Sequence, residues 1–395
     1  MSARPKAVVV GLAHAGLGLV RSLCLSNVDV VALTDGGDDD AWGRWTRFGE
    51  KVFCDLTRDG ALIEELLRLG RSQTKKAALF LTSDEQVEDV SRGRERLKPY
   101  FEVNLPEQAV LTAVNNKRLF HGMALLHGLP VPGTRYVGSV RDAQEAGACI
   151  AYPCILKPSY RTRRLSLSDT PKVIKCLDAA ELISGYRLFM PHNADCVVQE
   201  WVEGGDGEIY FCFAYRPFNY GETVFFTGRK IRQWPPYCGS TSVAEQCDNE
   251  EVVEATRRFI QAFDLRGYVS VEYKWHAGLK RFIIIEPTVG RANLQLALAS
   301  AAGFNLPFLI YCDAVGAGLP SVRTNRPGAK WVHEPHELYS AFYYMRNEGL
   351  TFRQWMTSLK GRRSYALYRW DDPLPFMSFL YGIMRNRLKR ARFFC

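Results

Sequence analysis

The sequence predicts an α/β domain first, then an α+β region and a helical segment at the C-terminus. Residues 7–10 form a β-branched run that ends at Gly11, and apolar residues then recur at helical spacing over residues 17–25. This order predicts a strand, a glycine turn and a helix. Alternating strands and helices are typical of a parallel sheet covered by helices. The alternation continues with a strand at residues 28–34, a helix at residues 61–69 and a strand at residues 77–82.

A different pattern begins after a helix predicted at residues 114–127, which the glycine- and proline-rich run 128–133 ends. The strands that follow have short connections and predict antiparallel hairpins, most clearly between residues 268–274 and 281–286. Other strands are predicted at residues 154–157, 196–201, 209–215 and 223–227, and helices at residues 250–263 and 294–302. We expect domains at residues 1–112, 113–318 and 319–395, the last helical and basic.

Composition narrows the class of protein. With 395 residues, of which 47% are apolar and 24% charged, the chain is typical of a globular protein. Its 11 cysteines include no Cys-x-x-Cys pair, which favours reduced thiols over a disulfide framework or a zinc site. No apolar run is long enough to span a bilayer, and the first residues lack the pattern of a signal peptide. We therefore expect a cytoplasmic protein.

Several short motifs follow one another in the middle of the chain. They are Asn116-Lys117, the run 152–158 with Lys157, the run 197–204, Glu272 in a β-rich run, and Glu286 in the next one. In this order and spacing they resemble the ATP-grasp superfamily over about residues 80–318. The stretches 227–236, 239–242 and 286–291 are similar to its carboxylate–amine ligase branch, which includes D-aspartate ligase.

The resemblance implies a Rossmann-like N-terminal domain, an ATP-grasp unit of two subdomains that close on the nucleotide, and a helical C-terminal appendage. It also implies ATP and Mg²⁺, or Mn²⁺ in its place, as the cofactors of a ligase. In such a ligase a small-molecule carboxylate attacks the γ-phosphate of ATP, and an amine then displaces phosphate from the acyl phosphate. The products are ADP, orthophosphate and a new carbon–nitrogen bond.

The nucleotide would be held by cations and by a hinge. Lys157 ends a buried-looking strand and Lys117 opens the neighbouring helix, so both can hold phosphates, although each lysine alone reads as a surface charge. The resemblance implies that adenine lies at Gln199, Glu200 and Val202, and ribose at Glu208. A solvated strand edge and hairpin is the alternative for these acidic residues.

Two carboxylates are the candidates for the metal. Glu272 and Glu286 lie in β-rich runs joined by a hairpin, which makes them neighbours, and Mg²⁺ prefers carboxylate oxygens. A buried salt bridge is the alternative for this pair. The superfamily often has Asn two residues after the second acid, but Thr288 stands there, so Asn293 or water is the expected third ligand.

Three further cations are candidates for the reacting groups. Arg291 is placed to stabilise charge on the transferred phosphoryl group. Lys230 and Arg232 are two residues apart, so a strand would point both to one face, where we expect the carboxylate substrate or its acyl phosphate. An exposed basic strand is the alternative. The basic loop 158–164 lacks the usual glycines of a phosphate-covering lid, and an exposed loop is an equally good interpretation.

Two other functional classes stay open at this point. The turn from Gly11 to Gly18, with His14 inside it and Asp35 after the next strand, permits a nicotinamide-dependent oxidoreductase, although its spacing departs from Gly-x-Gly-x-x-Gly. The net charge of +9 also permits a non-catalytic basic binding protein. Nucleic acid is not the expected partner, because the aromatic residues are not interleaved with the basic ones.

The C-terminal segment joins an apolar stretch to a run of cations. Residues 373–384 are largely apolar, and the cations that follow are Arg385, Arg387, Lys389, Arg390 and Arg392. The stretch is too short to span a bilayer but can lie on an anionic membrane surface. The alternative is that it packs on its own domain.

Overall fold

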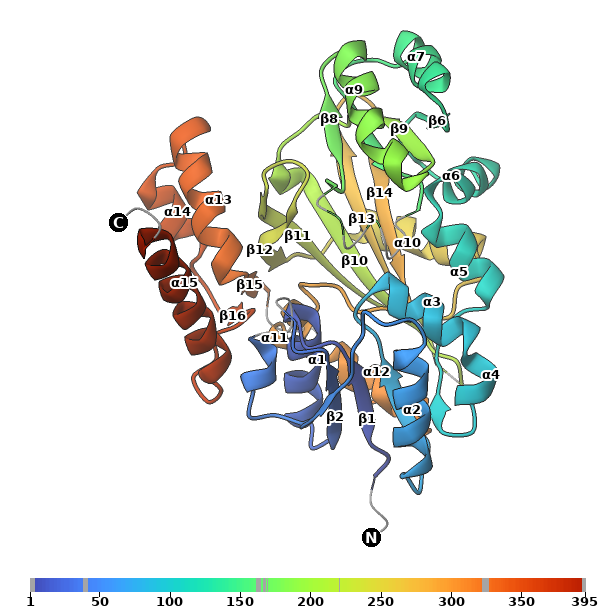
Figure 1. The fold of residues 1–395 in the computed structure, drawn as a ribbon, viewed down its shortest axis with the longest axis vertical. Coiled ribbons are helices and arrows are strands. Elements are labelled where there is room, and N and C mark those ends of the chain that lie inside the picture. Colours follow the sequence, from blue (N-terminus) through green and yellow to red (C-terminus); the bar gives the residue numbers. More distant parts are fainter. Residues whose placement is uncertain are drawn as a thin grey trace.

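The computed structural model describes residues 4–37, 42–160, 165, 168, 170–219, 221–321 and 327–392, without the side chains of residues 386–392. Most of the predicted basic loop 158–164 therefore lies outside the described residues. Three sheets organise the chain (Figure 1). Within the described part, no helix has the combination of length and apolar character that a bilayer-spanning helix requires.

The N-terminal sheet has five parallel strands in the order β3-β2-β1-β4-β5. The strands are β1 (Ala7–Val10), β2 (Val30–Thr34), β3 (Glu50–Phe53), β4 (Ala77–Phe80) and β5 (Phe101–Glu102). The helices are α1 (His14–Cys24), α2 (Ala61–Arg71), α3 (Asp84–Arg92) and α4 (Arg94–Leu97). β1 and β2 are buried along their whole length, as expected for strands with helices on both faces. The predicted alternation of helices with strands of a parallel sheet is confirmed.

The glycines of the first turn have a clear structural role. Gly11 has φ +85°, a left-handed conformation that residues with a Cβ rarely adopt. A Cβ on Gly16 would lie 1.9 Å from the carbonyl oxygen of Gly11. Glycine at these positions lets α1 start directly behind β1, so the turn is explained without a ligand.

A smaller antiparallel sheet of four strands follows, in the order β6-β9-β7-β8. The strands are β6 (Thr134–Val137), β7 (Cys154–Pro158), β8 (Ile174–Cys176) and β9 (Cys196–Glu200). They pack against α7 (Val140–Cys149) and α9 (Ala179–Phe189), and η2 (Met190–His192) follows α9. This unit has a hydrophobic core of its own, which includes Leu156, Leu182 and Phe189.

The largest sheet has seven strands in the order β14-β13-β10-β11-β12-β15-β16. They are β10 (Ile209–Arg216), β11 (Val224–Trp234), β12 (Ser240–Gln246), β13 (Gly267–His276), β14 (Arg281–Val289), β15 (Lys330–Val332) and β16 (Arg363–Tyr365). All neighbours are antiparallel except β15 and β16. The predicted hairpin between β13 and β14 is confirmed.

The remaining helices are distributed over the rest of the chain. They are α5 (Gln108–Asn115), α6 (Lys117–Leu126), α10 (Glu250–Ala262), α11 (Ala297–Ala301), α12 (Leu306–Ala314), α13 (Glu334–Asn347), α14 (Phe352–Ser358) and α15 (Leu374–Arg392), with short 3₁₀ turns η1 (Gly43–Trp45) and η3 (Asp206–Glu208). The helix predicted at about residues 114–127 is present as α6, but it begins later than predicted, because Asn116 is extended and caps α6 with its side chain. The segment after residue 318 is also not only helical, since it adds β15 and β16 to the large sheet.

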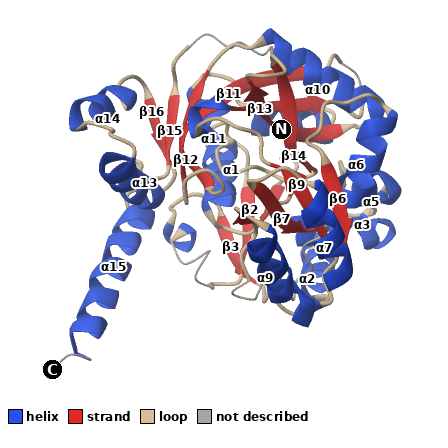
Figure 2. Cartoon of the chain, turned by 90° about the horizontal axis from the view of Figure 1, so that it is seen from above, coloured by secondary structure: helices blue, strands red, loops and turns tan. Residues whose placement is uncertain are grey.

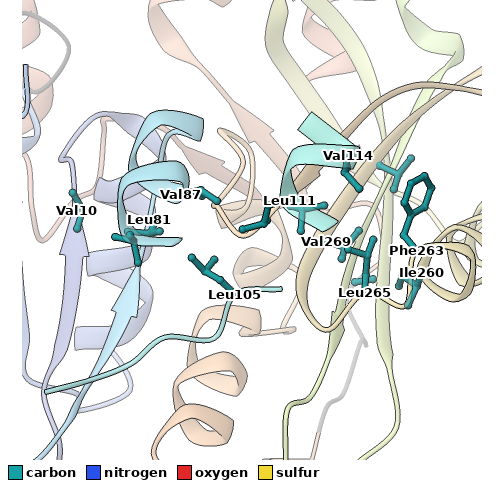
Figure 3. Close-up of a cluster of buried hydrophobic side chains, with 14 of the residues drawn as sticks. Val10, Leu81, Val87, Leu105, Leu111, Val114, Ile260, Phe263, Leu265 and Val269 are labelled. Carbon is teal, nitrogen blue, oxygen red and sulfur yellow. The ribbon is translucent and has the colours of Figure 1, made fainter. Parts of the chain in front are cut away.

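The N-terminal domain and the large sheet share one core. Figure 3 shows Val10 and Leu81 of the N-terminal domain in the same cluster as Leu111 of α5 and Val269 of β13. The small sheet has a separate core. Because side chains interlock within a core, the N-terminal domain and the large sheet are held as one block, whereas the small sheet packs around its own core.

Two buried ion pairs attach the C-terminal segment. Arg232 of β11 pairs with Glu337 of α13, and both side chains are almost completely buried. Arg21 of α1 donates from Nε to Asp372 at 2.9 Å, and the Asp372 carboxylate also accepts from the Thr46 hydroxyl at 2.6 Å. Removing one partner of such a pair leaves the other charge buried and uncompensated.

We predict that Asp372→Ala lowers the free energy of unfolding by about 3–5 kcal/mol, because the Arg21 guanidinium loses its counter-charge while it stays buried. Thermal melting should show a fall of several degrees. The control is Glu64→Ala, whose carboxylate forms a solvent-exposed pair with Arg58, and it should melt like the unchanged protein. Equal melting temperatures for both variants would contradict the structural role of Asp372.

Candidate functional site

A cavity lies where the small sheet meets the block formed by the other two units. It encloses about 700 Å³ of space, including its solvent-filled mouth. Five of the predicted site residues line it, namely Lys117, Lys157, Gln199, Glu286 and Arg291. Asp84, Val114, Asn115, Phe120, His121, Val131, Tyr160, Ile284, Ile285 and Pro287 complete the lining. Residues far apart in the sequence thus converge on one polar cavity.

The two lysines are held by the ends of neighbouring elements. Lys157 is the last but one residue of β7, and its side chain is buried. Lys117 is the first residue of α6, and its backbone N–H donates to the carbonyl oxygen of Ser159 at 2.8 Å. The Asn116 side chain accepts from the backbone N–H groups of the next turn and fixes the start of α6. The start of α6 is therefore tied to the end of β7, and both cations face one cavity.

The charge of Lys157 is poorly compensated. Burial and the nearby charge of Lys117 lower the pKa of the Lys157 ammonium to about 8, although Glu286 opposes this shift. An anion in the cavity would supply the missing counter-charge. The two lysines therefore have the electrostatics of an anion site.

Glu286 and Arg291 form the opposite wall with Asp84. The Glu286 carboxylate is exposed within the cavity. Removal from water raises the pKa of the Glu286 carboxyl, but the positive charges of Lys117, Lys157 and Arg291 lower it by a larger amount. The net shift is downward and favours the ionised form. Arg291 donates to Asp84 at 2.5 and 3.2 Å, which orients the guanidinium.

Asp84 was not expected from the sequence. It opens α3, where Ser83 and Gln86 form a reciprocal capping box. That box predicts a helix start, but nothing in the sequence relates Asp84 to Arg291, which lies 207 residues further along the chain. Tyr160 is a second unexpected lining residue, and its hydroxyl donates to Glu88 of α3.

Glu272 has a mixed environment. It lies directly opposite Glu286 in the register of β13 and β14, as the hairpin predicted. Its Oε2 accepts from Lys230 Nζ at 2.8 Å, so the ion pair weighed as an alternative is present. In the described ranges, no group of three or more His, Cys, Asp or Glu side chains is arranged to hold a metal ion. Two opposed carboxylates still fit Mg²⁺, which commonly binds one or two carboxylates together with substrate phosphates and water.

Lys230 and Arg232 do not form the joint basic face expected from their spacing. A bulge separates them, with Lys230 opposite Ala244 and Arg232 opposite the adjacent Val243. Lys230 contacts Glu272 and, at 3.1 Å, Gln233 Oε1. Arg232 instead pairs with Glu337. The expected common face is absent because a bulge interrupts the alternation of side chains along a strand. For each of the two residues, a role in the reaction stays a prediction.

The predicted adenine hinge is only partly in the cavity. Gln199 donates from Nε2 to the Thr134 hydroxyl at 2.9 Å, and its Oε1 is buried without a hydrogen-bond partner in the described structure. A buried carbonyl oxygen of this kind can accept from a ligand amine. Glu200 accepts from the backbone N–H of Gly133, and neither it nor Val202 nor Glu208 lines the cavity. Their nucleotide roles stay predictions.

Asn293 lies outside the cavity as well. Its Oδ1 accepts from the Tyr268 hydroxyl at 3.0 Å, and its side chain is buried. The amide oxygen that would bind a metal is thus engaged in a protein hydrogen bond. The third metal ligand stays a prediction without geometric support.

The comparisons with known proteins agree with the fold. No protein-family model matches the chain. A D-alanine–D-alanine ligase of Stutzerimonas stutzeri (strain A1501) is 30% identical over 77 residues, and the match spans only 20% of this chain and 23% of that ligase.

Solved structures match most of the chain. An ADP complex of N5-carboxyaminoimidazole ribonucleotide synthetase has TM-score 0.63 at 15% identity, covering 83% of this chain and 82% of that one. An L-amino acid ligase of Bacillus licheniformis has TM-score 0.60 at 13% identity, covering 80% and 74%. Biotin carboxylase of Campylobacter jejuni has TM-score 0.60 at 13% identity, covering 81% and 74%. The chain has the fold of the ATP-grasp ligases, so that part of the resemblance is confirmed. Its likeness to D-aspartate ligase in particular stays a prediction.

The pKa of Lys157 gives a testable pH dependence. Its folded value of about 8 lies below the usual 10.5, so the free protein loses this charge as the pH rises through about 8, while phosphate groups are already fully ionised. We predict that the ATP affinity measured by calorimetry falls about tenfold or more between pH 7.5 and 9.5.

Lys157→Arg is the matched variant, because a guanidinium keeps its charge throughout this range. Its affinity for ATP should be nearly independent of pH, and Lys157→Met should bind weakly at every pH. An undiminished pH dependence in Lys157→Arg would assign the effect to another group.

Proposed function

We propose that the protein is an ATP- and Mg²⁺-dependent ligase that activates a small-molecule carboxylate as an acyl phosphate and joins it to an amine. The observation that carries the proposal is the convergence of Lys117, Lys157, Glu286 and Arg291 on one cavity of the ATP-grasp fold. Phosphoryl transfer from a nucleotide needs cations that bind the phosphates and a carboxylate that binds the metal ion on those phosphates, and this set of residues supplies both.

The nucleotide is proposed to lie with its phosphates between the two lysines. Lys117 and Lys157 neutralise phosphate charge from two sides, and binding restores the full charge of Lys157. Adenine lies at the buried end, where Gln199 Oε1 accepts from its amino group. This arrangement satisfies both the unpaired oxygen and the uncompensated cation.

In the first chemical step, a carboxylate oxygen of the substrate attacks the γ-phosphorus and the bond to the β-phosphate oxygen breaks, which releases ADP. Arg291, held by Asp84, offsets the charge on the transferred group. In the second step the amine attacks the acyl carbon, orthophosphate leaves, and the amine loses a proton to solvent or to the leaving phosphate. Glu272 and Glu286 are the residues that would hold Mg²⁺, which supplies charge stabilisation at the phosphates when bound.

Glu286→Gln tests the metal-binding role. The amide keeps the size of the side chain but removes the charge that a hard cation needs, so turnover should fall by at least about a hundredfold. The variant should still fold, with a modestly lower melting temperature, because Lys117, Lys157 and Arg291 lose a counter-charge. Asp264→Asn, which neutralises an exposed carboxylate outside the cavity, should turn over normally. A Glu286→Gln enzyme of normal activity would exclude the assignment.

The same substitution at Glu272 separates its two possible roles. If Glu272 binds metal, Glu272→Gln loses turnover, and Mg²⁺-ATP no longer raises its melting temperature. If it serves only as the counter-ion of Lys230, the variant melts earlier, yet the stabilisation by Mg²⁺-ATP persists.

The reaction class is tested by its products. A screen of amino acids and other small carboxylates with ATP and Mg²⁺ should find one acid that releases ADP and orthophosphate, and hydroxylamine should trap the acyl phosphate as a hydroxamate. AMP and pyrophosphate would show adenylate chemistry and overturn the mechanism. A fluorescence titration that shows binding of NADH and none of ATP would favour the oxidoreductase instead.

A further inference from the structure

The C-terminal segment exposes an unusual concentration of large apolar side chains. More than half of those exposed in the described part of the chain lie between residues 338 and 384. They are Leu338, Tyr339, Phe342, Phe352, Met356, Tyr368, Trp370, Leu374, Met377, Leu380, Tyr381 and Met384. Single exposed apolar residues need no explanation, but such a concentration on one segment marks an interaction surface.

The exposed residues of α15 form one stripe. Leu374, Met377, Tyr381 and Met384 recur at steps of three and four, so they lie along the same face of the helix. Leu380 lies at the edge of this stripe. A helix face of this composition is normally covered, because leaving it in water forfeits the gain from burying apolar surface.

The protein itself covers a different face of α15. Phe376, Phe379 and Ile383 pack against Leu17 of α1 and Leu367, and the ring of Phe379 lies 5.3 Å from that of Trp42. The alternative that this segment packs on its own domain is therefore correct for one face only. Figure 2 shows α15 extending away from the rest of the molecule, which leaves its second face open.

Charge decides what can cover the stripe. From residue 374 to residue 395 the sequence has five cations, Arg385, Arg387, Lys389, Arg390 and Arg392, and no Asp or Glu. A second copy of the protein bound stripe to stripe would bring no Asp or Glu from this segment to pair with these cations. An anionic surface instead attracts the basic end while it receives the apolar stripe.

We propose that the stripe of α15 and the basic end that follows it bind the protein to the surface of an anionic lipid bilayer. The apolar part from Leu374 to Met384 is too short to span the hydrocarbon core, so α15 lies along the surface. Tyr381 and Trp370, which are 63% and 79% exposed, have the amphipathic rings that favour the headgroup region. This binding does not depend on the proposed ligase activity.

The experiment is vesicle co-sedimentation of the full chain at low and high salt. We expect binding to vesicles of phosphatidylcholine with phosphatidylserine, binding at least tenfold weaker to phosphatidylcholine alone, and release by salt. Met377→Ser with Tyr381→Ser should lower the partition coefficient at least tenfold. Arg387→Gln with Arg390→Gln should remove most of the preference for anionic vesicles.

The control is Leu188→Ser with Met190→Ser, which changes two exposed apolar residues of the small-sheet unit and should bind as the unchanged protein does. Melting temperatures show that each variant is folded. Absence of binding to both vesicle types, or undiminished binding by the stripe variant, would overturn the proposal. A dimer of the unchanged protein that becomes a monomer in the Met377→Ser, Tyr381→Ser variant, as measured by analytical ultracentrifugation, would also overturn it, since the stripe would then bind a second copy.

Discussion

An uncompensated positive charge at the junction of three structural units is the constraint on which the site depends. Lys117, Lys157 and Arg291 face one cavity, and among the described residues that line it the carboxylates are Asp84 and Glu286. Burial and the nearby charge of Lys117 make the imbalance costly, which is why the pKa of Lys157 falls to about 8. A polyanionic ligand would compensate this charge, so the electrostatic cost of burying Lys157 in the folded protein would favour ligand binding. This property connects the electrostatics of the cavity to the proposed nucleotide.

The arrangement of cores explains how the cavity is built and how it can adapt. The N-terminal sheet and the large sheet share one core (Figure 3). This shared core fixes Asp84 of α3 beside Arg291, which follows β14 of the large sheet. The small sheet carries Lys157 and Gln199 on a core of its own. One wall of the cavity is therefore rigid with respect to the main block, while the opposite wall belongs to a unit that shares no hydrophobic core with it.

The C-terminal segment is part of this architecture and also departs from it. β15 and β16 continue the large sheet (Figure 1). The Arg232–Glu337 and Arg21–Asp372 pairs anchor the segment at two points. Beyond these anchors, α15 buries one face against α1 and presents an apolar stripe on another. Because the segment is attached at these two points, binding of α15 to a membrane would hold the whole molecule at the membrane surface, as proposed above.

The sequence by itself determined the local elements and the ordered motifs. Strand and helix periodicity placed β1, β2 and β4 of the parallel sheet and the β13–β14 hairpin, and the motif order indicated the ATP-grasp fold. It placed Lys117, Lys157, Gln199, Glu286 and Arg291 in one site, and these residues do line one cavity.

Tertiary structure alone decided the rest, because the deciding interactions join residues that local patterns cannot relate. The Asp84–Arg291 pair depends on the packing of two units. The bulge in β11 separates Lys230 from Arg232, so that Lys230 pairs with the half-buried Glu272 and Arg232 with the buried Glu337. Asn116 ends one helix and starts another, since its side chain caps the second. Hydrophobic periodicity records which face of an element is buried, but it does not record which partner covers that face.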